Sequence, residues 1–271
     1  MSADGIPDLL SFKLPEQVSI SSKKGNFFFE KLAALNLRNG ISAKDNFHKK
    51  YINIVVNIFS SMLFSIRYST PIKLVNAIGL GHFSHRVSDS NKLLLGYFQS
   101  FKWASIPTTK EKLMQLKLKE YTGVISEYLQ LSRIEEPLIV HVRLGDYINE
   151  KTFGVPSLNY YANAINRMTE GYDIKKIWLF SDEPEKAKGF IPTKYWDKLR
   201  VIPEIEGSAA KTLEIMRFGK YYIIGNSTFS WWGAFLSYTP NTRVIAPTPW
   251  FMNSKSPIDL IPTEWEVIKA W

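Results

Sequence analysis

The carboxyl-terminal half of the chain alternates short apolar runs with longer amphipathic stretches. Five apolar runs predict buried strands, at Leu138–Val142, Lys176–Phe180, Arg200–Ile202, Tyr221–Ile224 and Arg243–Ala246. Four stretches between them predict helices, at Asn159–Met168, Pro184–Phe190, Leu213–Phe218 and Thr228–Leu236. Strands and helices that alternate in this way are typical of an α/β protein with a doubly wound parallel sheet.

The amino-terminal half has a different pattern, with one short strand and longer helical stretches. The expected elements are a strand near Val18–Ser21 and helices around Phe29–Leu37, Ile52–Phe64 and Lys110–Leu131. Charge and proline interrupt the pattern between Arg133 and Pro137, which favours a boundary there. We therefore expect an amino-terminal domain over residues 1–135 and a carboxyl-terminal domain over residues 136–271.

The most apolar stretch runs from Tyr51 to Ile66. It is shorter than the roughly 20 residues needed to cross a bilayer, and Asn53 and Asn57 interrupt it, so we expect a core helix. The opening residues lack the basic and then apolar layout of a signal peptide. Together with the absence of cysteine, this favours a reducing, cytoplasmic compartment.

The chain is basic, with 34 Lys and Arg against 25 Asp and Glu and a formal net charge of +9. This surplus favours anionic partners such as a nucleotide sugar, phospholipid headgroups or a nucleic acid. The Lys and Arg residues are scattered along the sequence and many aromatic residues lie in apolar runs, which argues against a nucleic-acid binder. With 271 residues, 45% of them hydrophobic, the chain can form one large core or two smaller ones.

Polar residues directly follow two of the predicted strands. Tyr221–Ile224 leads into Gly225-Asn226-Ser227-Thr228-Phe229-Ser230, a turn that begins a helix. Unpaired backbone N–H groups, hydroxyls and the positive end of the helix dipole suit such a turn to a phosphate. The alternative is that Asn226 and Ser227 only cap the helix.

The other strand, Leu138–Val142, leads into the motif His141-Val142-Arg143-Leu144-Gly145-Asp146-Tyr147. Arg143 either offers a bidentate grip to phosphate oxygens or forms a surface ion pair. His141 is either a proton carrier or a structural histidine, and Asp146 either acts chemically or organises the turn. Both motifs lie at the carboxyl ends of strands, the edge where open parallel sheets bind ligands.

Commoner site types are not favoured. Four histidines without cysteine give no spacing typical of a catalytic metal site, and Ser181-Asp182-Glu183 is expected to be a solvated turn before a helix. Gly79–Ser84 lacks the third glycine of a dinucleotide loop, and the sequence has neither a Walker A motif nor a Gly-x-Ser-x-Gly elbow. We expect neither a metal nor a bound cofactor.

The two strand-end motifs together resemble the α-1,2-fucosyltransferases of glycosyltransferase family 11. That family carries His-x-Arg-x-Gly-Asp-Tyr and, later in the chain, Asn-Ser-Thr-Phe-Ser-Trp-Trp-Gly-Ala. Further matching segments are Leu95–Ser100, Phe180–Glu183, Val244–Pro247, Trp250-Phe251 and Ile261–Trp265. The resemblance covers the chain from about Leu93 to its carboxyl end.

The resemblance implies a GT-B fold of two Rossmann-like domains. It also implies inverting, metal-independent transfer of L-fucose from GDP-fucose to the 2-hydroxyl of a galactoside in an oligosaccharide. Arg143 is then expected to grip the β-phosphate of the donor. The other expected donor-binding residues are His141, Asn226, Ser227, Ser230 and Asp182. Asp146 is a candidate for the base that takes the acceptor's proton, with Asp182 and Glu183 as alternatives.

The sequence also departs from the family pattern. Gly25 and Asn26, candidates for an acceptor-side loop, remain from a Gly-Gly-Leu-Gly-Asn-Gln turn, and Leu144 stands where many members carry a second arginine. Two alternatives therefore stay open: transfer with another GDP-sugar or acceptor, and a non-catalytic protein that binds the nucleotide sugar. Bacterial members most often act on a lipid-linked surface polysaccharide, which implies contact with the inner face of the plasma membrane.

Overall fold

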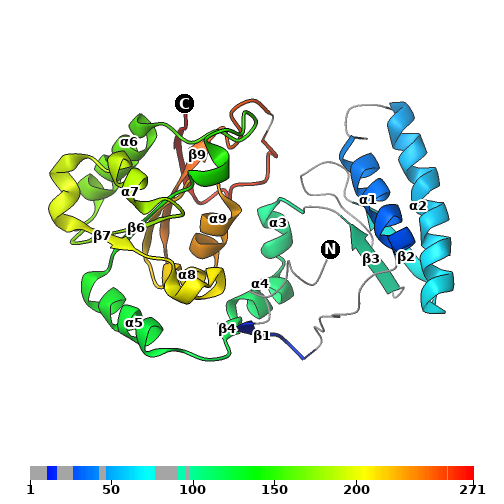
Figure 1. The fold of residues 1–271 in the computed structure, drawn as a ribbon, viewed down its shortest axis with the longest axis horizontal. Coiled ribbons are helices and arrows are strands. Elements are labelled where there is room, and N and C mark those ends of the chain that lie inside the picture. The colour runs from blue at the N-terminus through cyan, green and yellow to red at the C-terminus, as the bar shows by residue number, and fades with distance from the viewer. Residues whose placement is uncertain (1–10, 17–26, 43–46, 77–90, 96–97, 255) are drawn as a thin grey trace. The chain divides into compact units, whose positions relative to one another are not determined.

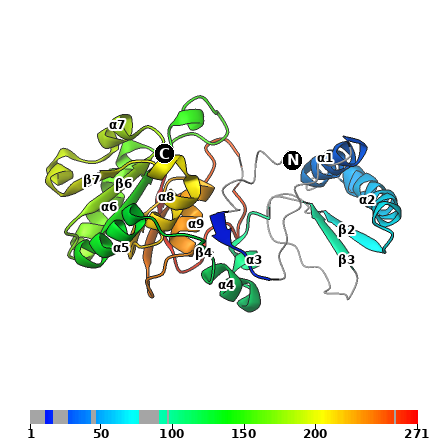
Figure 2. The same ribbon diagram turned by 60° about the horizontal axis from the view of Figure 1, so that its bottom comes forward.

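The computed structural model describes residues 11–16, 27–42, 47–76, 91–95, 98–254 and 256–271. They form two compact units, drawn from two directions in Figures 1 and 2. The described residues between 20 and 110, with 257–261, belong to the smaller unit, and the others belong to the larger unit. Within these described ranges, no helix is long and apolar enough to cross a membrane.

A six-stranded sheet forms the centre of the larger unit. Its strands are β5 (Leu138–Val142), β6 (Ile177–Ser181), β7 (Leu199–Ile202), β8 (Tyr221–Ile223), β9 (Arg243–Thr248) and β10 (Glu266–Lys269). They lie in the order β10-β9-β8-β5-β6-β7, and every neighbouring pair is parallel. This is the Rossmann strand order, in which the direction of winding reverses between β5 and β8. The predicted α/β class with a parallel sheet is confirmed.

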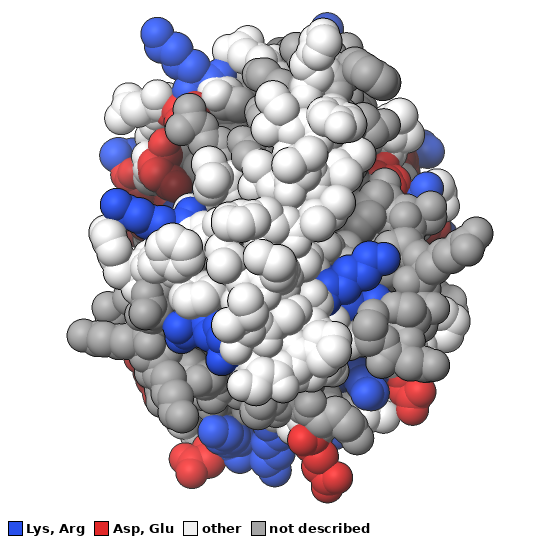
Figure 3. All heavy atoms as spheres, turned by 90° about the vertical axis from the view of Figure 1, so that its right-hand side faces the viewer, with Lys and Arg blue, Asp and Glu red and all other residues white. Residues whose placement is uncertain are grey.

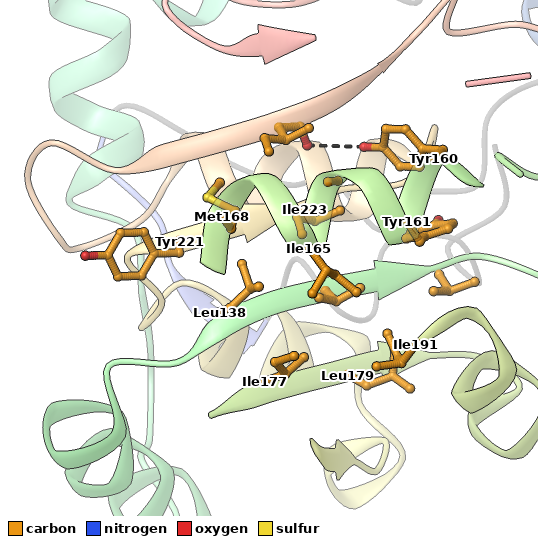
Figure 4. Packing of buried hydrophobic residues seen from close by; sticks show 14 of the residues in the cluster. Leu138, Tyr160, Tyr161, Ile165, Met168, Ile177, Leu179, Ile191, Tyr221 and Ile223 are labelled. Carbon is orange, nitrogen blue, oxygen red and sulfur yellow. Dashed lines mark hydrogen bonds between the residues drawn. The ribbon is translucent and has the colours of Figure 1, made fainter. Parts of the chain in front are cut away.

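Helices cover both faces of the sheet (Figure 1). They are α5 (Gly123–Glu135), α6 (Leu158–Gly171), α8 (Ala209–Met216) and α9 (Thr228–Phe235). The apolar side of α6 joins alternate residues of β5, β6 and β8 in one buried cluster (Figure 4). Because successive side chains of a strand alternate between faces, Trp178 and Tyr222 point to the opposite face. There the Trp178 ring contacts Tyr128 of α5, and the Tyr222 hydroxyl donates to the carbonyl of Met216 in α8.

The remaining elements of the larger unit are short. They are the 3₁₀ turns η3 (Gly145–Tyr147), η4 (Lys188–Phe190), η5 (Thr193–Lys198) and η6 (Ile205–Gly207), the helix α7 (Pro184–Ala187), and the antiparallel strands β1 (Phe12–Lys13) and β4 (Lys117–Leu118). The single helix predicted over Lys110–Leu131 is wrong. Helix α4 (Pro107–Met114) ends before β4, because Leu118 pairs with Phe12 of β1, and α5 begins anew at Gly123.

The smaller unit contains a parallel pair of strands and two long helices. Its elements are α1 (Phe27–Ser42), α2 (Phe47–Tyr68), β2 (Ile72–Asn76), β3 (Asn91–Leu95) and α3 (Phe101–Ala104). The helix predicted over Tyr51–Ile66 is confirmed within α2, but its assignment to a core is wrong, because the apolar side of α2 is exposed. The strand expected at Val18–Ser21, the loop residues Gly25 and Asn26, and the Gly79–Ser84 segment lie outside the described residues.

The division into units differs from the domain boundary expected at residue 135. Helix α5 belongs to the larger unit, where Glu135 accepts a hydrogen bond from Trp178 Nε1 at 2.6 Å and pairs with Arg200 at 2.6 Å. Both partners lie on the sheet, in β6 and β7. These contacts explain why the residues from 111 to 135 cluster with the carboxyl-terminal part of the chain.

Candidate active site

The two sequence motifs meet where the strand order reverses. The His141–Tyr147 motif leaves the carboxyl end of β5, and Gly225–Ser230 leaves the carboxyl end of β8, its neighbour in the sheet. A cavity of about 580 Å³ opens at this edge, with walls from the ends of β5, β6, β7 and β8. Five predicted site residues line it: His141, Arg143, Asp146, Asp182 and Ser227. In open parallel sheets, this crevice is where ligands bind.

Arg143 lies at the cavity wall, held by two carboxylates. Its Nε donates to Asp146 Oδ1 at 3.0 Å, its Nη2 lies 2.8 Å from the same oxygen, and its Nε lies 3.3 Å from Asp182 Oδ2. The Tyr147 ring lies 5.9 Å from the guanidinium carbon. The Arg143 side chain remains 37% exposed, so the guanidinium is both positioned and accessible to a ligand.

Asp182 shapes the loop that carries Arg143. Its Oδ1 accepts a hydrogen bond from the Leu144 backbone N–H at 3.0 Å. Gly145 follows, and a Cβ at that position would collide with the Asp182 carboxylate, so only glycine fits without a shift. The structure therefore gives Asp182 a positioning part in this loop. Its predicted contact with a donor stays a prediction.

His141 is buried at the base of the cavity. Its side chain packs against the Phe229 ring, with centroids 5.8 Å apart, and the residue is 5% exposed. Burial lowers the pKa of His141 to about 4; the Asp182 charge raises it and the Arg143 charge lowers it further. The imidazole is therefore neutral near pH 7. Its Nδ1 is also buried and has no hydrogen-bond partner among the described residues.

The turn after β8 begins helix α9 as predicted. Ser227 is the N-cap, and its Oγ accepts a hydrogen bond from the Phe229 N–H at 3.3 Å. Gly225 allows the chain to pass close to β5, since a Cβ there would lie 3.2 Å from the His141 carbonyl oxygen. This close passage brings the start of α9 beside the Arg143 loop.

The other two predicted residues of this turn bond to backbone. Asn226 Nδ2 donates to three carbonyl oxygens, of Phe153, Gly154 and Trp250, at 2.9, 3.0 and 3.2 Å. Ser230 is fully buried, and its Oγ donates to the Ser227 carbonyl at 3.1 Å. Both side chains thus hold the turn and its neighbouring loops in place. A direct contact of either with a donor stays a prediction.

Two tyrosines that sequence reasoning missed support the site from below. The Tyr160 hydroxyl donates to the Ile224 carbonyl at 2.6 Å, and the Tyr161 hydroxyl donates to the His141 carbonyl at 3.2 Å. Both side chains come from α6 and lie at one end of the buried cluster (Figure 4). Two consecutive tyrosines on the apolar side of a predicted helix could have indicated that their hydroxyls bond to the neighbouring strands, because a buried phenol needs a hydrogen-bond partner.

Glu204 and Thr212 also line the cavity and were not predicted. Glu204 follows β7, so the strand-end argument applied to the Arg200–Ile202 run could have found it. As for metals, among the described residues no group of three or more His, Cys, Asp or Glu side chains is placed to hold an ion.

The model of glycosyl transferase family 11 matches residues 88–269, a range that includes both motifs and the whole six-stranded sheet. The chain belongs to this family. The resemblance inferred from the His141–Tyr147 and Gly225–Ala234 segments is thereby confirmed.

Two curated relatives of this family 11 chain come from Escherichia coli. An alpha-1,2-colitosyltransferase is 32% identical over 170 residues, 58% of this chain and 56% of the relative. The O-antigen biosynthesis glycosyltransferase WbnK is 33% identical over 126 residues, 45% of this chain and 41% of the relative. The chain therefore spans about half the length of the curated relatives it matches.

Solved structures also show similarity to this family 11 chain. The fucosyltransferase NodZ from Bradyrhizobium matches with a TM-score of 0.36 and 18% identity, over 55% of this chain and 52% of NodZ. The ADP-heptose lipopolysaccharide heptosyltransferase II of E. coli matches with a TM-score of 0.36 and 15% identity, over 56% of this chain and 44% of that enzyme.

Proposed function

We propose that the protein transfers L-fucose from GDP-fucose to the 2-hydroxyl of a galactoside in an oligosaccharide, with inversion and without a metal. The observation that carries this proposal is the Arg143 guanidinium at the switch-point cavity, beside the start of α9. Membership of glycosyl transferase family 11 supports the reaction class. The GT-B arrangement of the two units is part of the same proposal.

Arg143 would stabilise the leaving group. As the bond between the anomeric carbon and the β-phosphate oxygen breaks, negative charge builds on GDP, and a planar guanidinium can share it through two hydrogen bonds. The Ser227 turn would add backbone N–H groups and the positive end of α9. Donors that are already in place before the reaction are worth about 10²–10³ in rate each.

Asp146 is our candidate for the general base. Its side chain is 67% exposed, whereas that of Asp182 is 22% exposed, so a diphosphate would displace Asp146 from Arg143 more readily than Asp182. The released carboxylate could then accept the proton of the acceptor hydroxyl. In this scheme the hydroxyl oxygen bonds to the anomeric carbon, its proton passes to Asp146, and GDP departs with the bonding electrons.

A second donor is favoured by one relative. The E. coli alpha-1,2-colitosyltransferase is 32% identical to this chain, and colitose is L-fucose without its 3-hydroxyl. A GDP-colitose donor would therefore present the same diphosphate to Arg143. The name of WbnK supports a bacterial surface polysaccharide as acceptor, and we propose an oligosaccharide carried on a lipid.

A donor panel tests this proposal. Purified protein in EDTA is given GDP-fucose, GDP-colitose or GDP-mannose with β-galactosides, and product linkage is determined by NMR. We expect a fucosyl product with an α-1,2 linkage. Faster turnover of GDP-colitose would assign the second donor instead. Binding of every GDP-sugar without turnover on any galactoside would favour a non-catalytic binding protein.

A further inference from the structure

Helix α2 exposes its apolar side. Six large apolar side chains at helical spacing make up what we call the outer face of α2: Ile52, Val55, Ile58, Phe59, Met62 and Ile66. Each of them is more than half exposed. Figure 3 looks onto this side of the molecule, where a broad uncharged band crosses the surface, with Lys and Arg and fewer Asp and Glu around it. A surface helix normally turns such a stripe toward the core.

The polar side of α2 faces the smaller unit and holds it together. The hydroxyl of Ser61 accepts a hydrogen bond from the Leu74 N–H at 2.9 Å, and that of Ser65 accepts one from the Ile72 N–H at 2.8 Å. Both partners belong to β2. On the α1 side, Asn36 Nδ2 donates to Ser60 Oγ at 2.8 Å. Because these bonds fix the rotation of α2, its apolar face points outward.

Charge is concentrated in the same part of the chain. Residues 20–110 contain 13 Lys and Arg against 3 Asp and Glu, whereas residues 111–271 contain 20 against 19. Helix α2 itself has no acidic residue and carries Lys49, Lys50 and Arg67. The positive surplus of the protein therefore lies in the segment that presents the apolar face.

We propose that the outer face of α2 docks the protein on an anionic lipid bilayer, with the helix lying in the plane of the interface. A one-sided apolar stripe can sink about 5–10 Å into the boundary between headgroups and acyl chains. Each nearby Lys or Arg adds roughly fivefold in affinity for an anionic surface. A nucleic acid would match the charge but not the six apolar side chains, so the bilayer accounts for both observations.

Vesicle flotation of the full chain tests this inference. We expect binding to phosphatidylcholine vesicles that contain phosphatidylglycerol, weakening with added salt, and at least about tenfold weaker binding to phosphatidylcholine alone. The double variant Ile58→Asp/Phe59→Asp should lose binding at least about tenfold. Ile134→Asp is the matched control, because Ile134 is 73% exposed on α5 in the larger unit, and it should bind as the wild type does.

A second measurement does not depend on loss of binding. The tryptophan of Phe59→Trp should shift its emission to the blue on anionic vesicles, relative to the wild type, whereas that of Ile134→Trp should not. The variant Arg67→Gln, which removes a cation of α2 itself, should weaken binding to anionic vesicles roughly fivefold and leave binding to neutral vesicles unchanged.

Three results would overturn the proposal. The wild-type protein could fail to float with anionic vesicles, or the Asp variants could bind as well as the wild type. Alternatively, the protein could form a dimer that Ile58→Asp dissociates and show no binding to lipid. The last result would assign the face to a second copy of the chain. The assay contains neither donor nor acceptor, so its failure is distinguishable from failure of the proposed glycosyl transfer.

Discussion

The larger unit has an extensive buried core and nearly balanced charges, whereas the smaller unit leaves the apolar side of α2 exposed and carries a surplus of cations. In the larger unit, Val140 of β5 and Ile223 of β8 are fully buried, and residues 111–271 carry nearly equal numbers of cations and anions. In the smaller unit, the apolar side of α2 is exposed and residues 20–110 carry a surplus of ten cations. The internal packing of the larger unit accounts for its own sequence. The exposed apolar side of α2 is the surface that our proposed contact with a bilayer would cover.

This difference separates two kinds of constraint. At the sheet edge of the larger unit, polar side chains are tied to each other and to backbone, as Asp182 and Asn226 illustrate. Such a site is organised before a ligand arrives, which is what catalysis requires of it. On α2, the polar side chains form hydrogen bonds within the smaller unit, whereas the apolar side chains of the outer face are exposed. An exposed apolar patch of this kind is typical of a surface that binds a partner or a membrane.

Loss of Arg143 should have the largest effect. We expect Arg143→Ala to reduce the rate of GDP release about 10²–10³-fold, because one preorganised donor to the leaving group is removed. The free energy of unfolding of this variant should change by less than about 1 kcal/mol, because the ion pairs of Arg143 are partly exposed. Arg200→Ala is the matched control: Arg200 is 39% exposed and also paired with a carboxylate. Equal activity losses in the two variants would argue against a special part for Arg143.

Core truncation should distinguish the two units by stability. Ile223→Ala removes a fully buried side chain beside β5 and should lower the free energy of unfolding by about 2–5 kcal/mol. Ile58→Ala removes a side chain that is 68% exposed and should change it by less than about 0.5 kcal/mol. Urea titration measures both. A large loss in Ile58→Ala would mean that the outer face of α2 packs within the protein.

Acid should destabilise the site through His141. The folded protein keeps this histidine neutral down to a pKa of about 4, whereas in the unfolded chain it takes up a proton near 6.5. The unfolded state therefore binds more protons between these values, and the free energy of unfolding falls by about 3 kcal/mol as pH drops from about 6.5 to about 4. The variant His141→Asn should lack this component. Comparison at pH 8 isolates the packing cost of the substitution, and an identical pH profile in both proteins would contradict the burial argument.

A modest loss of stability is expected from changes on the polar side of α2. Ser65→Ala breaks the hydrogen bond to the Ile72 N–H and should lower stability by about 1 kcal/mol, whereas Ser65→Thr keeps a hydroxyl and should recover most of it. Chemical denaturation followed by circular dichroism measures the difference. If Ser65→Ala were as stable as the wild type, the polar side would not hold the orientation of α2.

Much of the sheet could be predicted because its strands are buried on both faces. The Leu138–Val142 run matches β5, and the runs for β6 to β9 are displaced by only a few residues at their ends. Strand β10 was missed, because Glu266–Lys269 lies at the sheet edge with mostly exposed side chains and no apolar run. The strand-end rule also predicted one shared sheet edge for Arg143 and Ser227, and both residues line the same cavity.

The remainder depended on contacts between residues far apart in the sequence. Nothing near Asn226 in the chain indicates that its amide bonds to the carbonyls of Phe153 and Trp250. The orientation of α2 was equally hidden, because its apolar stripe would suit a core as well as a surface. The hydrogen bonds from β2 to Ser61 and Ser65, together with that from Asn36 to Ser60, show which side is buried.

Acceptor-dependent release of GDP from GDP-fucose tests the central claim most directly. The wild-type protein, in EDTA, is incubated with GDP-fucose and with or without β-galactoside acceptors. We predict that GDP accumulates only when donor and acceptor are both present. Absence of GDP release with every acceptor, from folded protein that binds GDP-fucose, would contradict the assignment of this sheet edge as a glycosyltransferase active site.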